Sequence, residues 1–143
     1  MTRYLLDTSI IGALTQQEPA PALLAWMADR SDEDLFVTAF SVMEIWRAVL
    51  AAPRGGHSED LRRWLSGAEG PEALFAGRVL SFDDRAARIW ARLMAESSAL
   101  GTRRSGLDMI VAAIAEANDC IVVTDNEAAY AGLPIVNPTR PES

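Results

Sequence analysis

Residues 121–125 have the sequence IVVTD, an unbroken apolar run that ends in a hydroxyl and a carboxylate. A strand with one face in water alternates apolar and polar residues, whereas an unbroken run is typical of a strand covered on both faces. Four further short runs are of this kind, at 4–6, 35–37, 79–80 and 134–136. The sequence therefore predicts a parallel sheet of five short strands, the fourth at 121–124, with both faces buried.

Segments with helical spacing of apolar residues lie between these runs. They cover 22–30, 41–51 and 58–65, then a helix between Asp83 and Gly101, and a last long helix that begins near Leu107. Asp83 is a predicted N-cap, and Gly101 suits the left-handed end of a helix. Strands that alternate with helices predict an α/β fold, here a three-layer α/β/α sandwich around the parallel sheet.

The size and composition of the chain limit the classes of protein to consider. Its 143 residues predict one domain, 1–143, and half of them are hydrophobic, as in soluble globular proteins. No apolar run is long enough to span a membrane, and the N-terminus lacks the apolar core of a signal peptide. The one cysteine, Cys120, cannot form an internal disulfide. We therefore expect a cytoplasmic protein with no membrane partner.

The net charge of −7 does not by itself indicate a nucleic-acid substrate, because surfaces that bind phosphates are usually basic. However, carboxylates that bind a metal are neutralised once the metal is present. All thirteen basic side chains are arginine, which binds phosphate bidentately, although genomic base composition explains the lack of lysine as well. Charge alone therefore leaves a nucleic-acid substrate open.

Four carboxylates stand where apolar strands give way to helices, or in the first turn of a helix. They are Asp7, Glu44, Asp108 and Asp125. Ligands of open α/β sheets bind outside the carboxyl ends of the strands, so these side chains are expected to converge at one edge of the sheet. Hard oxygen ligands suit Mg²⁺ or Mn²⁺, and such a site can activate water against a phosphodiester. The sequence therefore predicts a metal site there.

Each carboxylate taken singly has a second explanation, since these side chains also cap helices. Asp7 could cap the segment that follows it, and Asp125 could cap a final turn. Segments 41–44 and 105–108 both have the pattern of a capping box, with a serine three residues before a carboxylate. Capping alone does not require all four to lie beside strand ends and helix starts, so the set as a whole favours the metal site.

The ordered set of motifs resembles the PIN-domain family, most closely its VapC-type toxins with their FitB-like branch. The motifs are YLLDTS at 4–9, SVMEI at 41–45, LDMIVAA at 107–113, IVVTDN at 121–126 and GLPIVNP at 132–138. The resemblance implies a magnesium-dependent endoribonuclease, in which Mn²⁺ can substitute. It also implies the toxin of a type II toxin–antitoxin pair, which cleaves cellular RNA and is inhibited by a cognate antitoxin protein.

The resemblance assigns roles to residues of this chain, one by one. Asp7 and Asp108 match the family's principal metal ligands, and Glu44 would complete the metal site or orient a water molecule. Ser9 or Thr8 would hydrogen-bond the carboxylate of Asp7, although a plain capping hydroxyl explains them equally well.

The family's fourth acidic position is matched less closely. It falls on Asn126, two residues after the strand-end Thr124, while Asp125 stands one residue earlier. We expect Asp125 to be a lesser catalytic residue, and Asn126 and Thr124 to support the carboxylates. Family members often have Asp-Phe shortly afterwards, where this chain has Ala129 and Tyr130.

Other readings remain open. Arg103 and Arg104 either contact RNA phosphates or are solvated charges near a helix end. A PIN-like protein that binds its partner or RNA with little or no activity is the second candidate function. An aspartyl phosphatase with Asp7 as nucleophile is the third, and it is disfavoured because such enzymes have an acid where Ser9 stands.

The helical segments 22–30 and 41–65 carry large apolar residues that a small core has limited room to absorb. We expect part of this surface to form a homodimer contact and a groove for an antitoxin helix. The chain has four tryptophans at inward-looking helical positions, for which packing is a better explanation than base stacking. They are Trp26, Trp46, Trp64 and Trp90.

Overall fold

The computed structural model describes residues 2–15, 18–51, 53, 55, 57–68 and 70–140, without the side chains of 57, 58, 61 and 71. Five parallel strands form one sheet in the order β3-β2-β1-β4-β5. They are β1 (Arg3–Leu6), β2 (Leu35–Thr38), β3 (Val79–Leu80), β4 (Cys120–Val123) and β5 (Ile135–Val136). All five predicted strands are confirmed, and their ends differ from the expected ones by no more than one residue.

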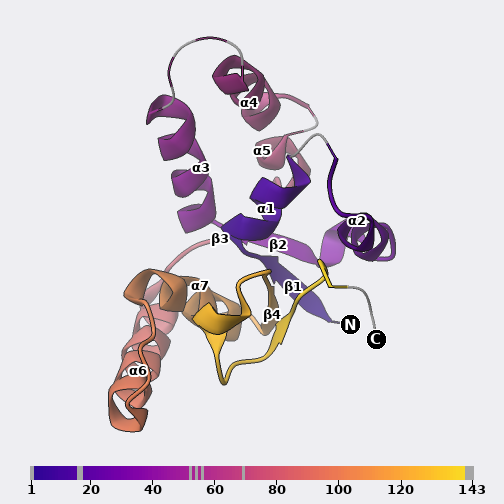
Figure 1. Ribbon diagram of the computed structural model, residues 1–143. Coiled ribbons are helices and arrows are strands. Elements are labelled where there is room, and N and C mark those ends of the chain that lie inside the picture. The colour runs from indigo at the N-terminus through magenta and orange to yellow at the C-terminus, as the bar shows by residue number, and fades with distance from the viewer. Residues whose placement is uncertain are drawn as a thin grey trace.

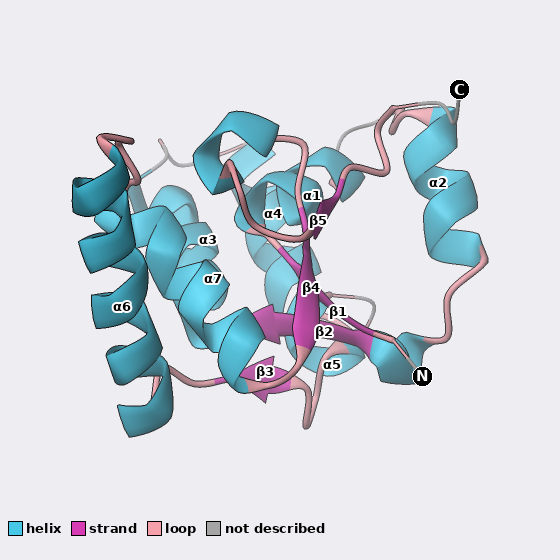
Figure 2. Cartoon of the chain, turned by 90° about the horizontal axis from the view of Figure 1, so that it is seen from below, coloured by secondary structure: helices cyan, strands magenta, loops and turns pink. Residues whose placement is uncertain are grey.

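The helices in the described part of the chain cover both faces of this sheet. They are α1 (Thr8–Leu14), α2 (Pro21–Ala28), α3 (Ala39–Ala51), α4 (His57–Ser66), α5 (Pro71–Leu74), α6 (Asp84–Leu100) and α7 (Gly106–Ala117), with short 3₁₀ turns η1 (Asp32–Asp34) and η2 (Glu127–Tyr130). Helices α1 to α5 lie on one side of the sheet and α6 and α7 on the other (Figure 1, Figure 2). The predicted three-layer α/β/α sandwich is therefore confirmed.

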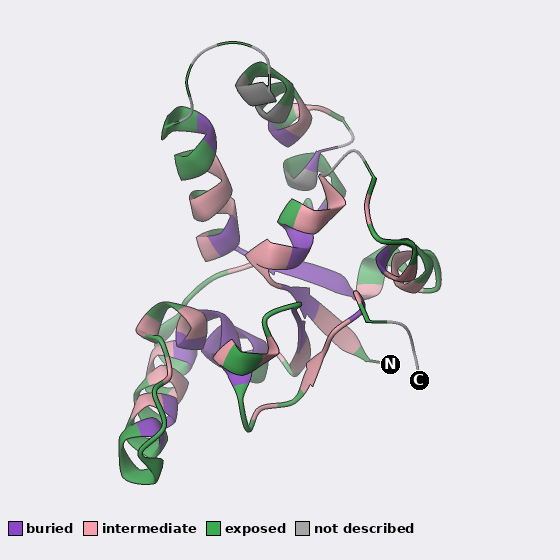
Figure 3. Cartoon of the chain, viewed as in Figure 1, coloured by how far each residue is buried: buried purple, intermediate pink, exposed green. Residues whose placement is uncertain are grey.

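The unbroken apolar strands are explained by this layering. Successive residues of a strand point to opposite faces. Leu5 and Val122 belong to the apolar cluster with α6 and α7, whereas Leu6 and Val123 belong to the cluster with α1 and α2. Figure 3 shows β2 buried along its length, as both clusters require. An apolar residue is therefore needed at every position of the central strands.

The ends of α6 are those that local sequence predicts. The carboxylate of Asp83 accepts a hydrogen bond of 2.9 Å from the N–H of Ala86, so Asp83 is the N-cap. Gly101 ends the helix with φ at 69°, a left-handed conformation that glycine adopts without steric penalty.

The expected start of α3 is wrong. Helix α3 begins at Ala39, two residues before Ser41, so Ser41 is not an N-cap and Glu44 lies in the second turn. The hydroxyl of Thr38, the last residue of β2, accepts a 2.9 Å hydrogen bond from the N–H of Ser41. Thr38 therefore does the capping that the 41–44 pattern assigned to Ser41.

Two shorter helices, α1 and α5, were not predicted as separate elements, and α2 ends two residues earlier than expected. The residues Pro53-Arg54-Gly55-Gly56 predict a break between the helices now seen as α3 and α4, and of these four Arg54 and Gly56 lie outside the described residues. None of the described helices is both long and apolar enough to cross a membrane.

Candidate active site

Asp7 lies at the carboxyl edge of the sheet, directly after β1. Its N–H donates to the carbonyl of Val123 at 2.9 Å, which joins the ends of β1 and β4. Its Oδ1 accepts from the N–H of Thr8 at 2.7 Å, and its Oδ2 accepts from the buried hydroxyl of Thr124 at 2.9 Å. Asp7 is thus the N-cap of α1, and both of its carboxylate oxygens are held in place.

Thr8 connects this carboxylate to that of Glu44. The Thr8 hydroxyl donates to Oε1 of Glu44 at 2.8 Å and lies 2.9 Å from the hydroxyl of Ser41. The Ser41 hydroxyl in turn lies 3.2 Å from that of Thr38. A chain of hydroxyl groups therefore links the start of α1 to the end of β2 and the first turns of α3.

Ser9 approaches Asp7 only through Thr124. The hydroxyls of Ser9 and Thr124 are 3.4 Å apart, and Thr124 also accepts from the N–H of Asn126 at 3.0 Å. The predicted bond from Ser9 or Thr8 to Asp7 is therefore made by the backbone of Thr8, not by either hydroxyl.

Asp108 lies in the first turn of α7, where the hydroxyl of Ser105 accepts from its N–H at 3.4 Å. Burial raises the pKa of the Asp108 carboxyl above its ordinary value, and the negative charge of Asp7 raises it further. A hydrogen bond from the Ser105 side chain to the Asp108 carboxylate lowers this pKa and so acts in the opposite direction. Asp7 and Asp108, from opposite layers of the sandwich, are therefore close enough to repel each other.

The pair of carboxylates fits a hydrated divalent cation. In the described part of the chain, no three carboxylate, imidazole or thiolate groups are gathered closely enough to form a complete metal site. Mg²⁺ usually keeps several waters and takes one or two protein carboxylates, so Asp7 and Asp108 suffice as donors. Glu44, which the Thr8 hydroxyl holds beside Asp7, stays a predicted residue that completes the metal site or orients a water molecule.

Tyr130 is a residue of this site that sequence reasoning missed. Its side chain is 1% exposed, and its hydroxyl makes no hydrogen bond to any described residue. Burial raises the pKa of this phenol, and the charges of Asp7 and Asp108 raise it further. The only signal in the sequence was a hydroxyl-bearing aromatic residue six positions after Thr124.

Asp125 and Asn126 differ from the three other predicted residues. Both are exposed, and neither side chain forms a hydrogen bond or an ion pair with the described residues. The N–H of Asn126 supports Thr124, but through the backbone. Their roles in catalysis stay predictions.

The two arginines before α7 have opposite environments. The Arg104 side chain is 9% exposed, donates to the carbonyl of Leu93 at 2.9 Å and lies 3.5 Å from Glu96. Arg104 thus ties the loop to α6 and has little surface to offer to RNA. Arg103 is exposed and makes no hydrogen bond or ion pair to the described residues.

The raised pKa of Asp108 predicts how metal-free stability depends on pH. Between the ordinary value of 3.8 and the raised pKa, the folded chain binds this proton more tightly than the unfolded chain does. The free energy of unfolding should therefore fall as pH rises through this window. We expect Asp108→Asn to remove this pH-dependent part of the free energy of unfolding and to stabilise the metal-free protein at neutral pH. Thermal melts in EDTA from about pH 4 to pH 7 test this, and an unchanged pH dependence in the variant would contradict it.

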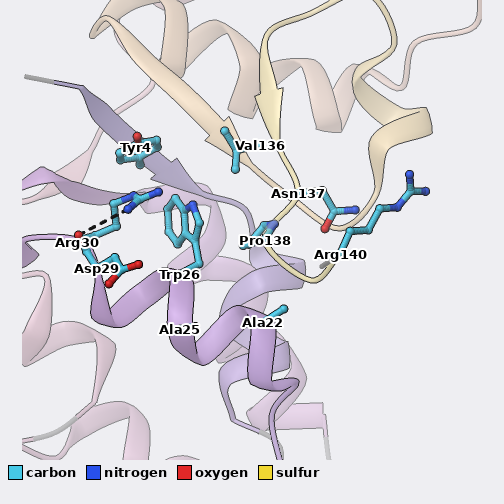
Figure 4. A pocket seen from close by; sticks show the side chains of 10 residues that line it. All are labelled: Tyr4, Ala22, Ala25, Trp26, Asp29, Arg30, Val136, Asn137, Pro138 and Arg140. Carbon is cyan, nitrogen blue, oxygen red and sulfur yellow. Dashed lines mark hydrogen bonds between the residues drawn. The ribbon is translucent and has the colours of Figure 1, made fainter. Parts of the chain in front are cut away.

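A separate pocket of about 530 Å³ lies between α2 and the segment after β5 (Figure 4). Its lining includes Tyr4, Trp26 and Arg30, and the Arg30 guanidinium stacks 4.5 Å from the centre of the Trp26 ring. No carboxylate of the Asp7 site lines it. The pocket therefore lies between α2 and the strands β1 and β5 and is not part of the acidic site.

Comparison with known proteins identifies the family to which this fold belongs. The PIN domain family matches residues 4–131. The chain is similar to the VapC ribonuclease Y4jK of Sinorhizobium fredii, with 36% identity over 95% of this chain and 97% of the relative. It is 29% identical to the toxin FitB of Neisseria gonorrhoeae over 94% of this chain and 96% of that one. The crystal structure of FitAcB from Neisseria gonorrhoeae is similar over 94% of this chain and 97% of its own, with 28% identity and a TM-score of 0.85. The chain belongs to the PIN domain family.

Proposed function

We propose that this protein is a metal-dependent endoribonuclease and the toxin of a type II toxin–antitoxin pair, which hydrolyses phosphodiester bonds of cellular RNA. The observation that carries the proposal is the meeting of Asp7 and Asp108 at the carboxyl edge of the sheet, with Glu44 joined to them through Thr8. Relatives named as a VapC ribonuclease and as toxin FitB support the same function.

Asp7 and Asp108 would hold Mg²⁺, or Mn²⁺ in its place. When bound, the cation supplies positive charge to the phosphodiester and lowers the pKa of water. Thr8 and Thr124 keep the Asp7 carboxylate oriented through its two oxygens. Glu44, held by the Thr8 hydroxyl, is suited to accept a proton from the attacking water.

The exposed Arg103 is proposed as a contact for RNA phosphates, since its guanidinium is not committed to other described groups. The net negative charge of the chain does not prevent this contact, because the carboxylates of the site repel RNA phosphates less once they hold a cation. The cytoplasm is the proposed location, as cellular RNA is the proposed substrate.

The phosphatase alternative is weakened by the residue two positions after Asp7, where aspartyl phosphatases have an acid and this chain has Ser9. Ser9 faces Thr124, so the acid that such phosphatases have near the nucleophile has no counterpart here. The binding-protein alternative differs from the proposal only in activity, and the following measurement separates the two.

Cleavage of RNA by the purified, antitoxin-free protein should require Mg²⁺ or Mn²⁺. We expect product to appear with either ion, to stop in excess EDTA and to resume when Mg²⁺ is restored, because the cation offsets the charge of the phosphodiester. Gel analysis of a defined single-stranded RNA provides the measurement. Full cleavage in EDTA would contradict the metal mechanism, and no cleavage with any divalent ion would favour the binding protein.

We further propose that a homodimer contact and an antitoxin groove share the apolar surface of α2, α3 and α4. Trp26 and Trp64 pack against the buried core, so they supply less of this surface than the sequence suggested. Leu24 on α2 is 48% exposed, and Met43 and Leu50 on α3 are 54% and 67% exposed. These side chains are the candidates for partner contacts. A strict monomer at tens of micromolar in light scattering would contradict the dimer.

Antitoxin binding should survive neutralisation of the acidic site. In the variant Asp7→Asn/Glu44→Gln/Asp108→Asn, apolar contacts on the helices still supply most of the binding free energy, so we expect a complex. The electrostatic part of inhibition should weaken as salt is raised. Calorimetry with the cognate antitoxin protein measures both effects. Complete loss of binding by a folded variant would place the affinity at the acidic site.

A further inference from the structure

Tyr130 ends η2 and is the bulkiest of the fully buried side chains in the described residues. It belongs to the same apolar cluster as Met109 of α7 and Val122 of β4. Met109 is the neighbour of Asp108, and Val122 precedes the strand end that reaches Thr124. The ring therefore holds the turn after β4 against the start of α7, directly beneath the acidic site.

The hydroxyl of Tyr130 is not explained by this packing. It is buried, and no hydrogen-bond partner for it exists among the described residues. A buried polar group without a partner is unfavourable, and phenylalanine would fill the same space without that penalty. The hydroxyl therefore requires a partner that the cation-free chain does not supply.

The surroundings of the hydroxyl identify that partner. Burial, followed by the charges of Asp7, Asp108 and Glu44, raises the pKa of the phenol, so it stays protonated and can donate. These three carboxylates come from three separate segments of the chain, yet all act on one phenol. Asp7 affects the phenol through its charge and through a smaller hydrogen-bonding contribution, but the hydroxyl has no partner within ordinary hydrogen-bonding distance and angle among the described residues.

The lone pairs of Asp7 leave room for one more donor besides a cation. A carboxylate can accept about four interactions, two at each oxygen. Thr8 and Thr124 occupy one position on each oxygen. One further donor and one cation would complete the set, and Tyr130 is the unpartnered donor beside it.

We propose that Tyr130 is a positioning residue of the cation site, whose hydroxyl donates a hydrogen bond to the Asp7 carboxylate once a divalent cation is bound. The inference rests on the proposed function. Without a cation, the charges of Asp7 and Asp108 repel each other. A shared cation removes the repulsion, so the Asp7 carboxylate can settle against the phenol. The phenol is neutral, so it orients Asp7 without reducing the negative charge that attracts the cation.

The variant Tyr130→Phe removes only the hydroxyl. Loss of a group that orients a metal ligand typically lowers metal affinity or activity by about 10- to 100-fold. We expect Mn²⁺ binding in calorimetry to weaken by about 10-fold or more, and kcat to fall while KM for RNA stays the same. The melting temperature in EDTA should be unchanged or higher, since a buried unpaired hydroxyl is gone.

Tyr4→Phe is a matched control, because Tyr4 is the only other tyrosine and packs edge-on against Trp26 at 5.1 Å. It should leave Mn²⁺ affinity and kcat unchanged. In the parent protein labelled with ¹³C at tyrosine Cζ, added Mg²⁺ should shift the Tyr130 signal and not that of Tyr4. A shift confined to Tyr130 places the cation beside this phenol, and the loss of Mn²⁺ affinity in Tyr130→Phe separates a positioning role from a merely structural one.

Unchanged Mn²⁺ affinity and kcat in Tyr130→Phe would overturn the inference, as would a Tyr130 signal that Mg²⁺ does not move. A variant that loses melting temperature in EDTA but keeps its Mn²⁺ affinity would also overturn it. The two proposals fail separately. If the parent cleaves RNA and the variant matches it, only the inference fails. If the parent does not cleave RNA but Tyr130→Phe weakens Mn²⁺ binding, the inference stands without the proposed function.

Discussion

Replacing Asp7 by Asn is expected to reduce RNA cleavage by roughly three orders of magnitude, because a metal's charge stabilisation is worth several kcal/mol. Asn keeps the oxygen that accepts from Thr8, and its amide can donate to the Thr124 hydroxyl, which can accept instead. The variant loses the negative charge but not the shape of the site. The loss of activity should therefore come from the cation and not from the fold.

The same variant should be at least as stable as the parent when no metal is present. Asn is as good an N-cap as Asp, so α1 keeps its cap, and the repulsion of Asp108 disappears. Adding Mg²⁺ should raise the melting temperature of the parent but not of the variant, because only the parent binds the ion in its folded state. Thermal melts with and without Mg²⁺, beside the cleavage assay, measure both effects.

Asp83→Asn is the matched control, since Asp83 is also a helix N-cap, here through the N–H of Ala86, and is not part of the acidic site. It should retain both cleavage and the stabilisation by Mg²⁺. If Asp7→Asn cleaves RNA as well as this control does, Asp7 is not a metal ligand. If it instead loses about 1 kcal/mol or more of stability, the role of Asp7 as a cap outweighs its repulsion with Asp108.

Replacing Ile114 by Ala should lower the free energy of unfolding by roughly 2–5 kcal/mol. Ile114 is fully buried on α7, in the cluster that also contains Leu93 of α6 and Val122 of β4. Truncation removes apolar contacts and leaves a cavity in a layer that is covered on both sides. A loss of this size is a large part of the total stability of a small domain.

Leu107→Ala on the same helix is the control, because Leu107 is 59% exposed. Its effect should stay within about 0.5 kcal/mol. Urea unfolding in EDTA at one fixed protein concentration compares the two, since dimerisation would make stability depend on concentration. Equal effects of the two substitutions would show that α7 is not packed as described. Where Ile114→Ala remains folded, it should still cleave RNA, because Asp108 is in the first turn of α7 and not in the cavity.

The sequence alone determined the layers of this protein and several of its helix ends. Leu5 and Leu6 are both apolar because successive residues of a strand face opposite helical layers, and that requirement is readable without a structure. The N-cap at Asp83 and the left-handed Gly101 depend on neighbours within four residues, so local pattern was sufficient. Parallel strands also place their carboxyl ends at one edge, which is why Asp7 could be assigned to the site.

Local pattern was not sufficient where two caps were available. Ser41 stands three residues before Glu44, as in a capping box, but Thr38 lies at the end of β2 and caps the helix first. The choice depended on where β2 ends, and that was decided by its pairing with β3, in which Thr38 is opposite Leu80. Glu44 consequently lies in the second turn, where the Thr8 hydroxyl reaches it.

Only the tertiary structure decided the surroundings of Tyr130, Arg104 and Arg103. A 3₁₀ turn and a short loop have no apolar period long enough to predict which way a side chain faces. The Arg104 guanidinium donates to the carbonyl of Leu93, eleven residues earlier, because the loop folds back along α6. Arg103 beside it is exposed. Tyr130 faces Asp7 and Asp108 because β1, α7 and η2 meet at one place, although the three residues are far apart in sequence. Contacts of this kind depend on how separate layers pack, and no local stretch of sequence contains that information.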